Sequence, residues 1–106
     1  MNALDHTFGA LADPTRRGVI DLLRREPRRA SDLADKLGAS RPAMSRHLRV
    51  LRESGLVAAS EHEDARVRVY HLKPEKFAEL REWLEQVELF WSDQLAAFAE
   101  HVKKKR

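Results

Sequence analysis

The sequence predicts a mainly α-helical fold with one small β-hairpin, and three features of the chain support this. Apolar residues recur at spacings of three and four through most of the 106 residues, as they do along one face of a helix. Residues 56–60 and 67–72 have the composition of two short strands. Two of the helical patterns meet at a tight turn, Gly38-Ala39-Ser40, which is typical of a helix-turn-helix.

Two short helices are expected before that unit. Residues 3–12 form an amphipathic pattern that must pack on another element. Its apolar face carries Leu4, Phe8 and Leu11. Asp13 and Pro14 then restart the chain as the N-cap and the first residue of a second helix, which Pro27 stops. The buried stripe of this second helix is Val19, Ile20 and Leu23. The arginines around Pro27 are expected to form a solvated rim that attracts phosphate.

Residues 31–54 are predicted to form the helix-turn-helix. Ser31 and Ser40 are suitable N-caps for its two helices, and Gly38 can take the left-handed conformation that ends the first. Ala34 is small where the helices must cross closely. The apolar stripe of the second helix is Met44, Leu48 and Leu51.

The second helix of this unit has a polar face that suits DNA. It carries short hydroxyls and guanidinium groups, which reach base edges and phosphates in a major groove. Four arginines stand against one acid, Glu53, so the helix has a net charge of +3. The polar residues off the apolar stripe are Ser40, Arg41, Ser45, Arg46 and Arg49. A solvated arginine-rich helix is the alternative, and the adjacent turn favours DNA binding.

Residues 56–72 are expected to form a hairpin, or wing, directly after that helix. In its second strand Val67 and Val69 point to one face, and Arg66, Arg68 and Tyr70 to the other. Arg66 and Arg68 are candidates for contact with phosphate or the minor groove, and an ordinary hairpin with an exposed arginine face is the equal alternative. The tip is acidic, with Glu61, Glu63 and Asp64, so it is not expected to enter a groove.

Residues 74–102 predict one long final helix, followed by a basic tail at residues 103–106. No Gly or Pro interrupts it, and its apolar face is too wide and too long for a small domain to cover. We therefore expect a homodimer formed by this helix and residues 3–12, because the chain has no second long helix for an intramolecular hairpin. The expected interface residues are Leu4, Phe8, Leu11, Trp83, Val87, Phe90, Trp91, Leu95 and Phe98.

Composition limits the classes of function. A chain of 106 residues is expected to form one domain, residues 1–106, and it has no cysteine for disulfides, thiolate metal sites or nucleophiles. No run of 18 apolar residues predicts a membrane span, and no secretory signal is evident, so a cytoplasmic protein is expected. No nucleophile, base and orienting group converge in sequence, and no glycine-rich phosphate loop exists, so no catalytic site is expected.

Two segments, residues 10–23 (ALADPTRRGVIDLL) and 32–57 (DLADKLGASRPAMSRHLRVLRESGLV), resemble the ArsR-type winged helix-turn-helix regulators. The resemblance covers about residues 3–98, and residues 81–95 look like a cysteine-free branch. It implies a homodimer through the first and last helices, a roughly palindromic operator in double-stranded DNA, and repression relieved by an effector. The positions that match the family's DNA helix are Ser40, Arg41, Pro42, Ala43, Ser45, Arg46, His47 and Arg49.

The chain departs from the metal-sensing members of that family. They use thiolates, or paired Asp and His ligands along the last helix, whereas this chain offers only His47 on the DNA helix and His101 on the last helix. A transition-metal site needs three or four converging ligands, so neither metal nor cofactor is expected. His47 itself is expected to donate to a phosphate or base, or else to pack against the preceding helix of the unit, in a DNA-facing or half-buried position. The identity of any small-molecule effector stays open.

Two further functions remain possible at this point. One is a winged-helix module that binds protein, against which the arginine excess argues. The other is a nonspecific architectural DNA binder, which would bind scrambled DNA equally well.

Overall fold

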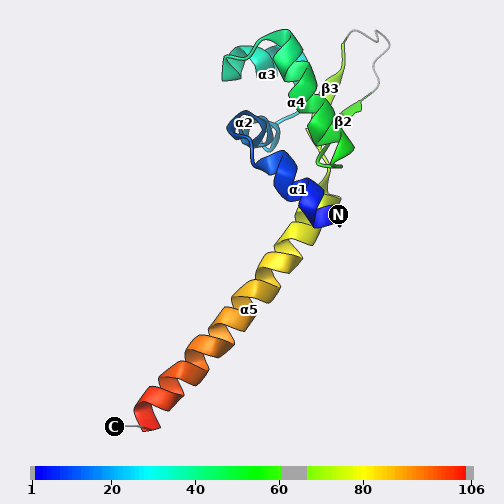
Figure 1. Cartoon of the computed structure of the whole chain (residues 1–106). Helices are drawn as coiled ribbons and strands as arrows, with labels where there is room; N and C mark the ends of the chain where they lie inside the picture. Colours follow the sequence, from blue (N-terminus) through cyan, green and yellow to red (C-terminus); the bar gives the residue numbers. More distant parts are fainter. Residues whose placement is uncertain (1, 61–66, 105–106) are drawn as a thin grey trace.

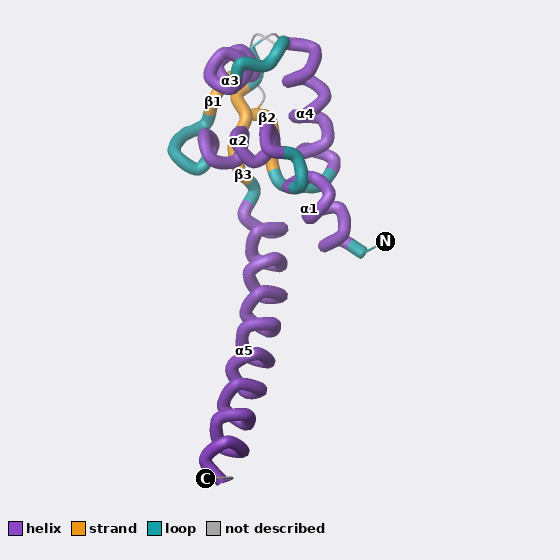
Figure 2. The backbone as a smooth tube through the Cα atoms, turned by 60° about the vertical axis from the view of Figure 1, so that its left-hand side comes forward, coloured by secondary structure: helices purple, strands orange, loops and turns teal. Residues whose placement is uncertain are grey.

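In the computed structural model, a small helical unit with a three-stranded sheet sits at one end of a long single helix (Figures 1 and 2). The structure describes residues 2–60 and 67–104. In chain order the elements are α1 (Ala3–Leu11), α2 (Pro14–Leu23), β1 (Arg28–Arg29), α3 (Ala30–Leu37), α4 (Arg41–Glu53), β2 (Val57–Ser60), β3 (Val69–Leu72) and α5 (Pro74–Lys104). The prediction of a mainly helical winged helix-turn-helix is confirmed.

Polar caps begin three of the helices. Asn2 caps α1 in a reciprocal capping box with Asp5, which the sequence analysis did not predict. Asp13 caps α2 by accepting from the backbone N–H of Arg16, and Ser40 caps α4 by accepting from that of Ala43. Both of these caps were predicted. Each satisfies a backbone donor that has no partner within its helix.

The start of α3 differs from the prediction. Ser31 was expected to be its N-cap, but α3 begins at Ala30, and Arg29 holds the cap position without a side-chain hydrogen bond. The physical reason is the strand β1, which pairs antiparallel with β3 and leads directly into the helix. Arg29 is thus extended by the sheet, and Ser31 already lies inside the first turn.

The sheet has the order β1-β3-β2 and is antiparallel throughout. The two strands of the wing were predicted, while the two-residue β1 was not. The backbones of Arg28 and Arg29 pair with Tyr70 and Val69, so both residues belong to the sheet. The side chain of Arg28 is only 12% exposed, whereas Arg29 is exposed, as expected for the solvated rim. Strand β1 was not predicted because a strand of two residues is too short to show the alternation of apolar and polar residues by which strands are recognised in a sequence.

One apolar core holds the helix-turn-helix to the sheet. Its buried residues are Ala10, Val19, Leu23, Leu33, Ala34, Met44, Leu48, Leu51, Leu56, Val57 and Tyr70. Ala34 is buried, as expected for the small residue on the core face of α3. Helix α2 also packs closely on α3 at Gly18. A Cβ atom added to this glycine would lie only 2.8 Å from Leu37 Cδ2. The stripes predicted for α2 and α4 face this core, and Leu33 and Ala34 of α3 are buried in it as well.

The last helix leaves the rest of the molecule. Helix α5 has 31 residues, which corresponds to about 46 Å, and only its first turns lie beside α1 (Figures 1 and 2). The radius of gyration is 19.3 Å, against about 13 Å for a compact chain of this size. No residue of α5 is fully buried. The length predicted for this helix is confirmed, and its apolar face is open in the single chain.

Candidate nucleic-acid interface

Helix α4 has a basic, exposed outer face and an apolar inner face that packs on the core. Met44, Leu48 and Leu51 are buried on its inner side and fix the helix against α3 and the sheet. The outer side is exposed at the positions that the sequence predicted for DNA contact, namely Ser40, Arg41, Pro42, Ser45, Arg46 and Arg49. Ala43, on the same predicted list, is only partly exposed. The outer face therefore has the shape and the charge of a helix that enters a major groove.

A cleft of about 340 Å³ lies beside α4. Its lining comes from β1, the start of α3, the N-terminal part of α4 and the base of the wing. The lining residues are Arg29, Ala30, Ser31, Arg41, Met44, Ser45, Val67, Arg68 and Tyr70. Arg68 and Tyr70 share this cleft, but so does Val67, which the predicted alternation placed on the opposite face. The physical reason is that β3 begins only at Val69, so residues 67 and 68 precede the strand.

The side chains that line the cleft carry an excess of positive charge. Arg29, Arg41 and Arg68 line it, and within residues 2–60 and 67–104 none of them has an acidic partner within ion-pair distance. The neighbouring Arg28 behaves differently. Its side chain is only 12% exposed, and it is neutralised by Asp32 at 2.9 Å and by Glu26 at 3.5 Å. Adjacent arginines thus have opposite roles, since Arg28 is held in the fold and Arg29 faces the cleft.

Sequence reasoning missed Arg29 and Ser31 as candidate interface residues. Both precede the predicted helix-turn-helix contacts in sequence, and only the pairing of β1 with β3 brings them beside Arg68. The run of arginines around Pro27 was the available signal. Another predicted site residue, Arg66, lies outside the described residues, as do the acids predicted for the wing tip.

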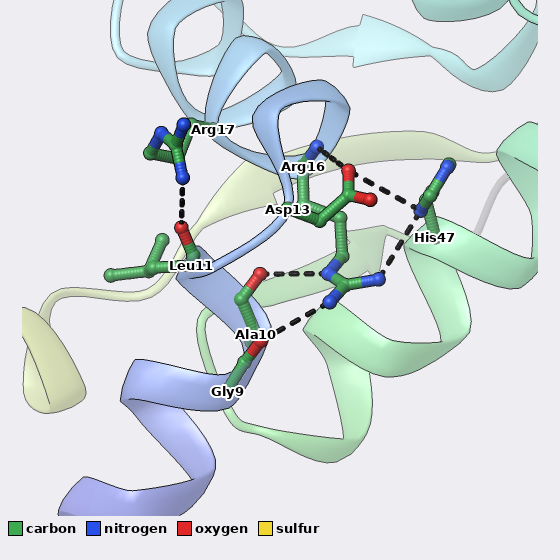
Figure 3. Close-up of polar contacts among 7 residues, drawn as sticks. All are labelled: Gly9, Ala10, Leu11, Asp13, Arg16, Arg17 and His47. Carbon is green, nitrogen blue, oxygen red and sulfur yellow. Dashed lines mark hydrogen bonds and ion pairs between the residues drawn. The ribbon is translucent and has the colours of Figure 1, made fainter.

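His47 lies on the inner edge of α4 and faces the start of α2 (Figure 3). Its side chain is 21% exposed, and its Nδ1 lies 3.4 Å from Nη1 of Arg16 and 4.0 Å from Oδ1 of Asp13. The hydrogen bond from the backbone N–H of Arg16 lowers the pKa of the Asp13 carboxyl, and the charge of the Arg16 guanidinium acts in the same direction, against partial desolvation, which raises it. The ring is half-buried, as one of the two expectations had it, but it lies against Asp13 and Arg16 at the start of α2 and not against α3.

The residues predicted for a dimer interface lie along α1 and α5. Phe8 packs edge-to-face on Trp83, with ring centroids 5.3 Å apart, so the two helices share one apolar surface. Leu4, Leu11 and Val87 are partly buried at this end. The remaining predicted residues, further along α5, are exposed: Phe90, Trp91, Leu95 and Phe98.

Among the residues that the structure describes, no three His, Asp or Glu side chains come together as a metal site would require. Within residues 2–60 and 67–104, no helix combines the length and hydrophobicity needed to cross a membrane.

Comparison with known proteins identifies close relatives. Residues 13–59 match the family described as "Bacterial regulatory protein, arsR family". The chain is 38% identical to the HTH-type transcriptional regulator Rv2034 of Mycobacterium tuberculosis, over 91% of this chain and 85% of that protein. It is 30% identical to the transcriptional repressor SdpR of Bacillus subtilis, over 76% of this chain and 88% of that protein.

Solved structures agree with the sequence relatives. The ArsR-like transcriptional regulator from Rhodococcus sp. RHA1 superimposes with a TM-score of 0.82 at 30% identity, covering 96% of this chain and 92% of that one. The homodimeric winged helix-turn-helix DNA-binding domain Mb0332 of Mycobacterium bovis gives 0.66 at 26% identity, covering 81% and 78%.

Proposed function

This chain belongs to the ArsR family of bacterial regulatory proteins, and from that premise we propose that it represses transcription by binding a palindromic operator as a homodimer. It is a DNA-binding regulator and not an enzyme, as the names of its relatives indicate. We assign the whole chain, residues 1–106, to one such domain, and we place its action in the cytoplasm. The observation that carries the proposal is the exposed basic face of α4, seated on a buried core beside an arginine-lined cleft.

The homodimer rests on the open apolar surface of α1 and α5. Phe98 is 66% exposed and lies far from the compact part of the chain, together with Trp91 and Leu95. A continuous apolar stripe of this length is rare on a monomer and marks an interface. A second copy of the same chain supplies a matching stripe, because twofold interfaces use the same patch on both subunits. The relative Mb0332 is itself described as homodimeric.

Within each protomer, we assign two kinds of DNA contact to α4. Arg41 and Ser45 are close to the cleft and to the groove-facing start of the helix, and we give them base recognition. A good bidentate contact of this kind discriminates by about 1–3 kcal/mol. Arg46 and Arg49 are exposed on the outer face, and we give them phosphate contacts, which position the helix without reading sequence.

We assign the cleft to the sugar–phosphate backbone of one DNA strand. Arg29 and Arg68 converge on it from β1 and from the segment before β3, while Arg41 and Ser45 form its border on the side of the base-reading helix. The hydroxyl group of Ser31 adds a neutral donor for phosphate oxygens. Arg68, and by extension the base of the wing, would then contact the backbone next to the major groove that α4 occupies.

The experiment separates these roles by affinity for matched and scrambled duplexes. The probe is the palindrome that the wild-type protein selects from a random duplex library. Arg41→Ala should relax sequence preference, so that affinity for the selected and scrambled duplexes approaches the same value. Arg29→Ala should weaken binding to both duplexes alike, by about tenfold, because it removes a charge contact that reads no base.

Arg81→Ala is the matched control, since Arg81 is exposed on α5 and paired with Glu85, away from α4 and the cleft. It should leave both affinities unchanged. A wild-type protein that selects no common sequence, or binds scrambled DNA equally well, would instead support an architectural DNA binder. Failure to bind any duplex would support a module that binds protein.

A further inference from the structure

The guanidinium of Arg16 is fixed to the end of helix α1. Its Nε donates to the carbonyl of Ala10 at 2.7 Å, and its Nη2 donates to the carbonyl of Gly9 at 3.1 Å (Figure 3). Both carbonyls belong to the last turn of α1, where backbone acceptors have few partners within the helix, and that of Gly9 also accepts from the backbone N–H of Ala12. Two donors of one planar group therefore hold the side chain of Arg16 in one orientation against α1.

The remaining nitrogen of the same group reaches the DNA-binding helix. Nη1 of Arg16 lies 3.4 Å from Nδ1 of His47, on the inner edge of α4. Asp13 Oδ1 accepts from the backbone N–H of Arg16 at 3.0 Å and lies 4.0 Å from the same ring nitrogen. One continuous set of polar contacts thus joins the end of α1, the start of α2 and the middle of α4 (Figure 3).

We propose that Arg16 is a positioning residue, which acts through His47 to set the angle of α4 relative to the dimer surface. The inference rests on the proposed function, since it takes α1 as part of the dimer interface and α4 as the DNA helix. In a homodimer the two copies of α4 must match the separation of two half-sites on one face of the duplex. Arg16 contacts both ends of this path, so it determines the half-site separation that the dimer accepts.

Arg17 provides a matched control in the same chain. Its Nη1 donates to the carbonyl of Leu11 at 2.7 Å, so it also satisfies the end of α1, and within the described residues its side chain makes no hydrogen bond to another helix. Arg16→Met and Arg17→Met both remove guanidinium hydrogen bonds to carbonyls at the end of α1, two for Arg16 and one for Arg17. Only the first also removes the contact to α4.

The test measures affinity for three kinds of duplex: the palindrome selected by wild-type protein, versions with the half-sites moved apart by a few base pairs, and a single half-site. Arg16→Met should lose about tenfold on the selected palindrome and less than about twofold on the single half-site. It should also bind the altered spacings nearly as well as the selected one. Arg17→Met should behave as wild type on all three.

Equal losses of Arg16→Met on the palindrome and the half-site would overturn the proposal, as would equal behaviour of the two arginine variants. The route through His47 is tested with His47→Phe and the double variant. If Arg16 acts through this ring, the double variant binds the palindrome within about twofold of Arg16→Met alone, whereas fully additive losses contradict it.

A readout without DNA separates this proposal from the proposed function. Nitrogen NMR of the His47 ring reports which nitrogen carries the proton. In the wild type Nδ1 should be the acceptor, and Arg16→Met should change the ring signals while Arg17→Met leaves them unchanged. Identical His47 signals in all three proteins would overturn the role of Arg16 even if operator binding is confirmed. Absence of any selected sequence, with the expected ring signals, would instead overturn the proposed function.

Discussion

Gly38 holds the turn between α3 and α4 in a backbone conformation that few residues adopt. Its φ is +64°, and an added Cβ would have no neighbour within 4 Å. The need for glycine at this position is therefore set by the backbone, and not by lack of space. The same turn aims Ser40 at the backbone N–H of Ala43, so one residue with unusual geometry places the start of the DNA helix.

Replacing Gly38 tests this requirement. Gly38→Ala should lower the free energy of unfolding by about 1–2 kcal/mol, because the left-handed conformation places a Cβ too close to the next carbonyl. Gly38→Asn should cost less, since asparagine enters this conformation more readily than alanine. Chemical denaturation measures both values. An alanine variant as stable as the wild type would show that the turn relaxes without cost.

Similar residues have different roles in this chain because of what lies next to them in space. Ser31 and Ser40 are equally good caps by composition, yet only Ser40 accepts a backbone N–H, because β1 extends Arg29 into the cap position of α3. In the same way Arg28 is buried against Asp32 while Arg29 lines the cleft. The sequence alone therefore does not show which serine caps a helix or which arginine faces the cleft.

At the scale of the elements, α5 has the helical conformation that its sequence predicts, but many of its large apolar side chains are exposed. Its apolar spacing predicted a helix, and the structure has one of 31 residues. Its first turns meet α1 through Phe8 and Trp83, but the far half extends away from the other helices and strands that the structure describes. Hydrophobic residues at Phe98 and Leu89 are equally exposed, at 66%. They lie nine residues apart and therefore on opposite faces of the helix.

That pair gives a test of the dimer surface. Phe98 belongs to the apolar stripe and Leu89 does not, so Phe98→Asp should raise the dimer dissociation constant by more than about tenfold, while Leu89→Asp should leave it within about twofold. The reason is that only the first substitution places a charge in the interface of each subunit. Sedimentation velocity over a range of concentrations measures both. The opposite ranking would assign the interface to the other face of α5.

At the scale of the whole molecule, charge and apolar surface are separated. Residues 1–72 have a net charge of +3, residues 73–102 have a net charge of −4, and residues 103–106 add +4. The basic excess of the first part includes the arginines of α4 and the cleft, whereas the acidic excess follows α5. Binding to DNA and association with a second copy therefore depend on different forces.

Salt should distinguish these two associations. If the dimer contacts about six phosphates, its affinity for DNA should fall about a thousandfold between about 50 and about 200 mM salt, because counterions are released on binding. The dimer itself should change little, since its interface is apolar. Arg49→Ala should reduce the slope of log K against log salt by about one per protomer. An unchanged slope would remove Arg49 from the phosphate contacts.

The sequence by itself determined the helices, the turn, the two wing strands and the arginine-rich face of α4. These features depend on neighbours within a few residues, since helix caps, glycine turns and apolar spacing are local. The open stripe of α5 was also predictable, because its apolar spacing is continuous over many turns.

Only the tertiary structure decided which residues meet across the chain. The pairing of Arg28 and Arg29 with β3 made the cleft, and the packing of α1, α2 and α4 brought Arg16 to His47. These contacts join residues tens of positions apart, and they depend on where whole elements settle against one core. The order of neighbouring residues does not determine which distant residues come into contact, so these contacts could be identified only in the folded structure.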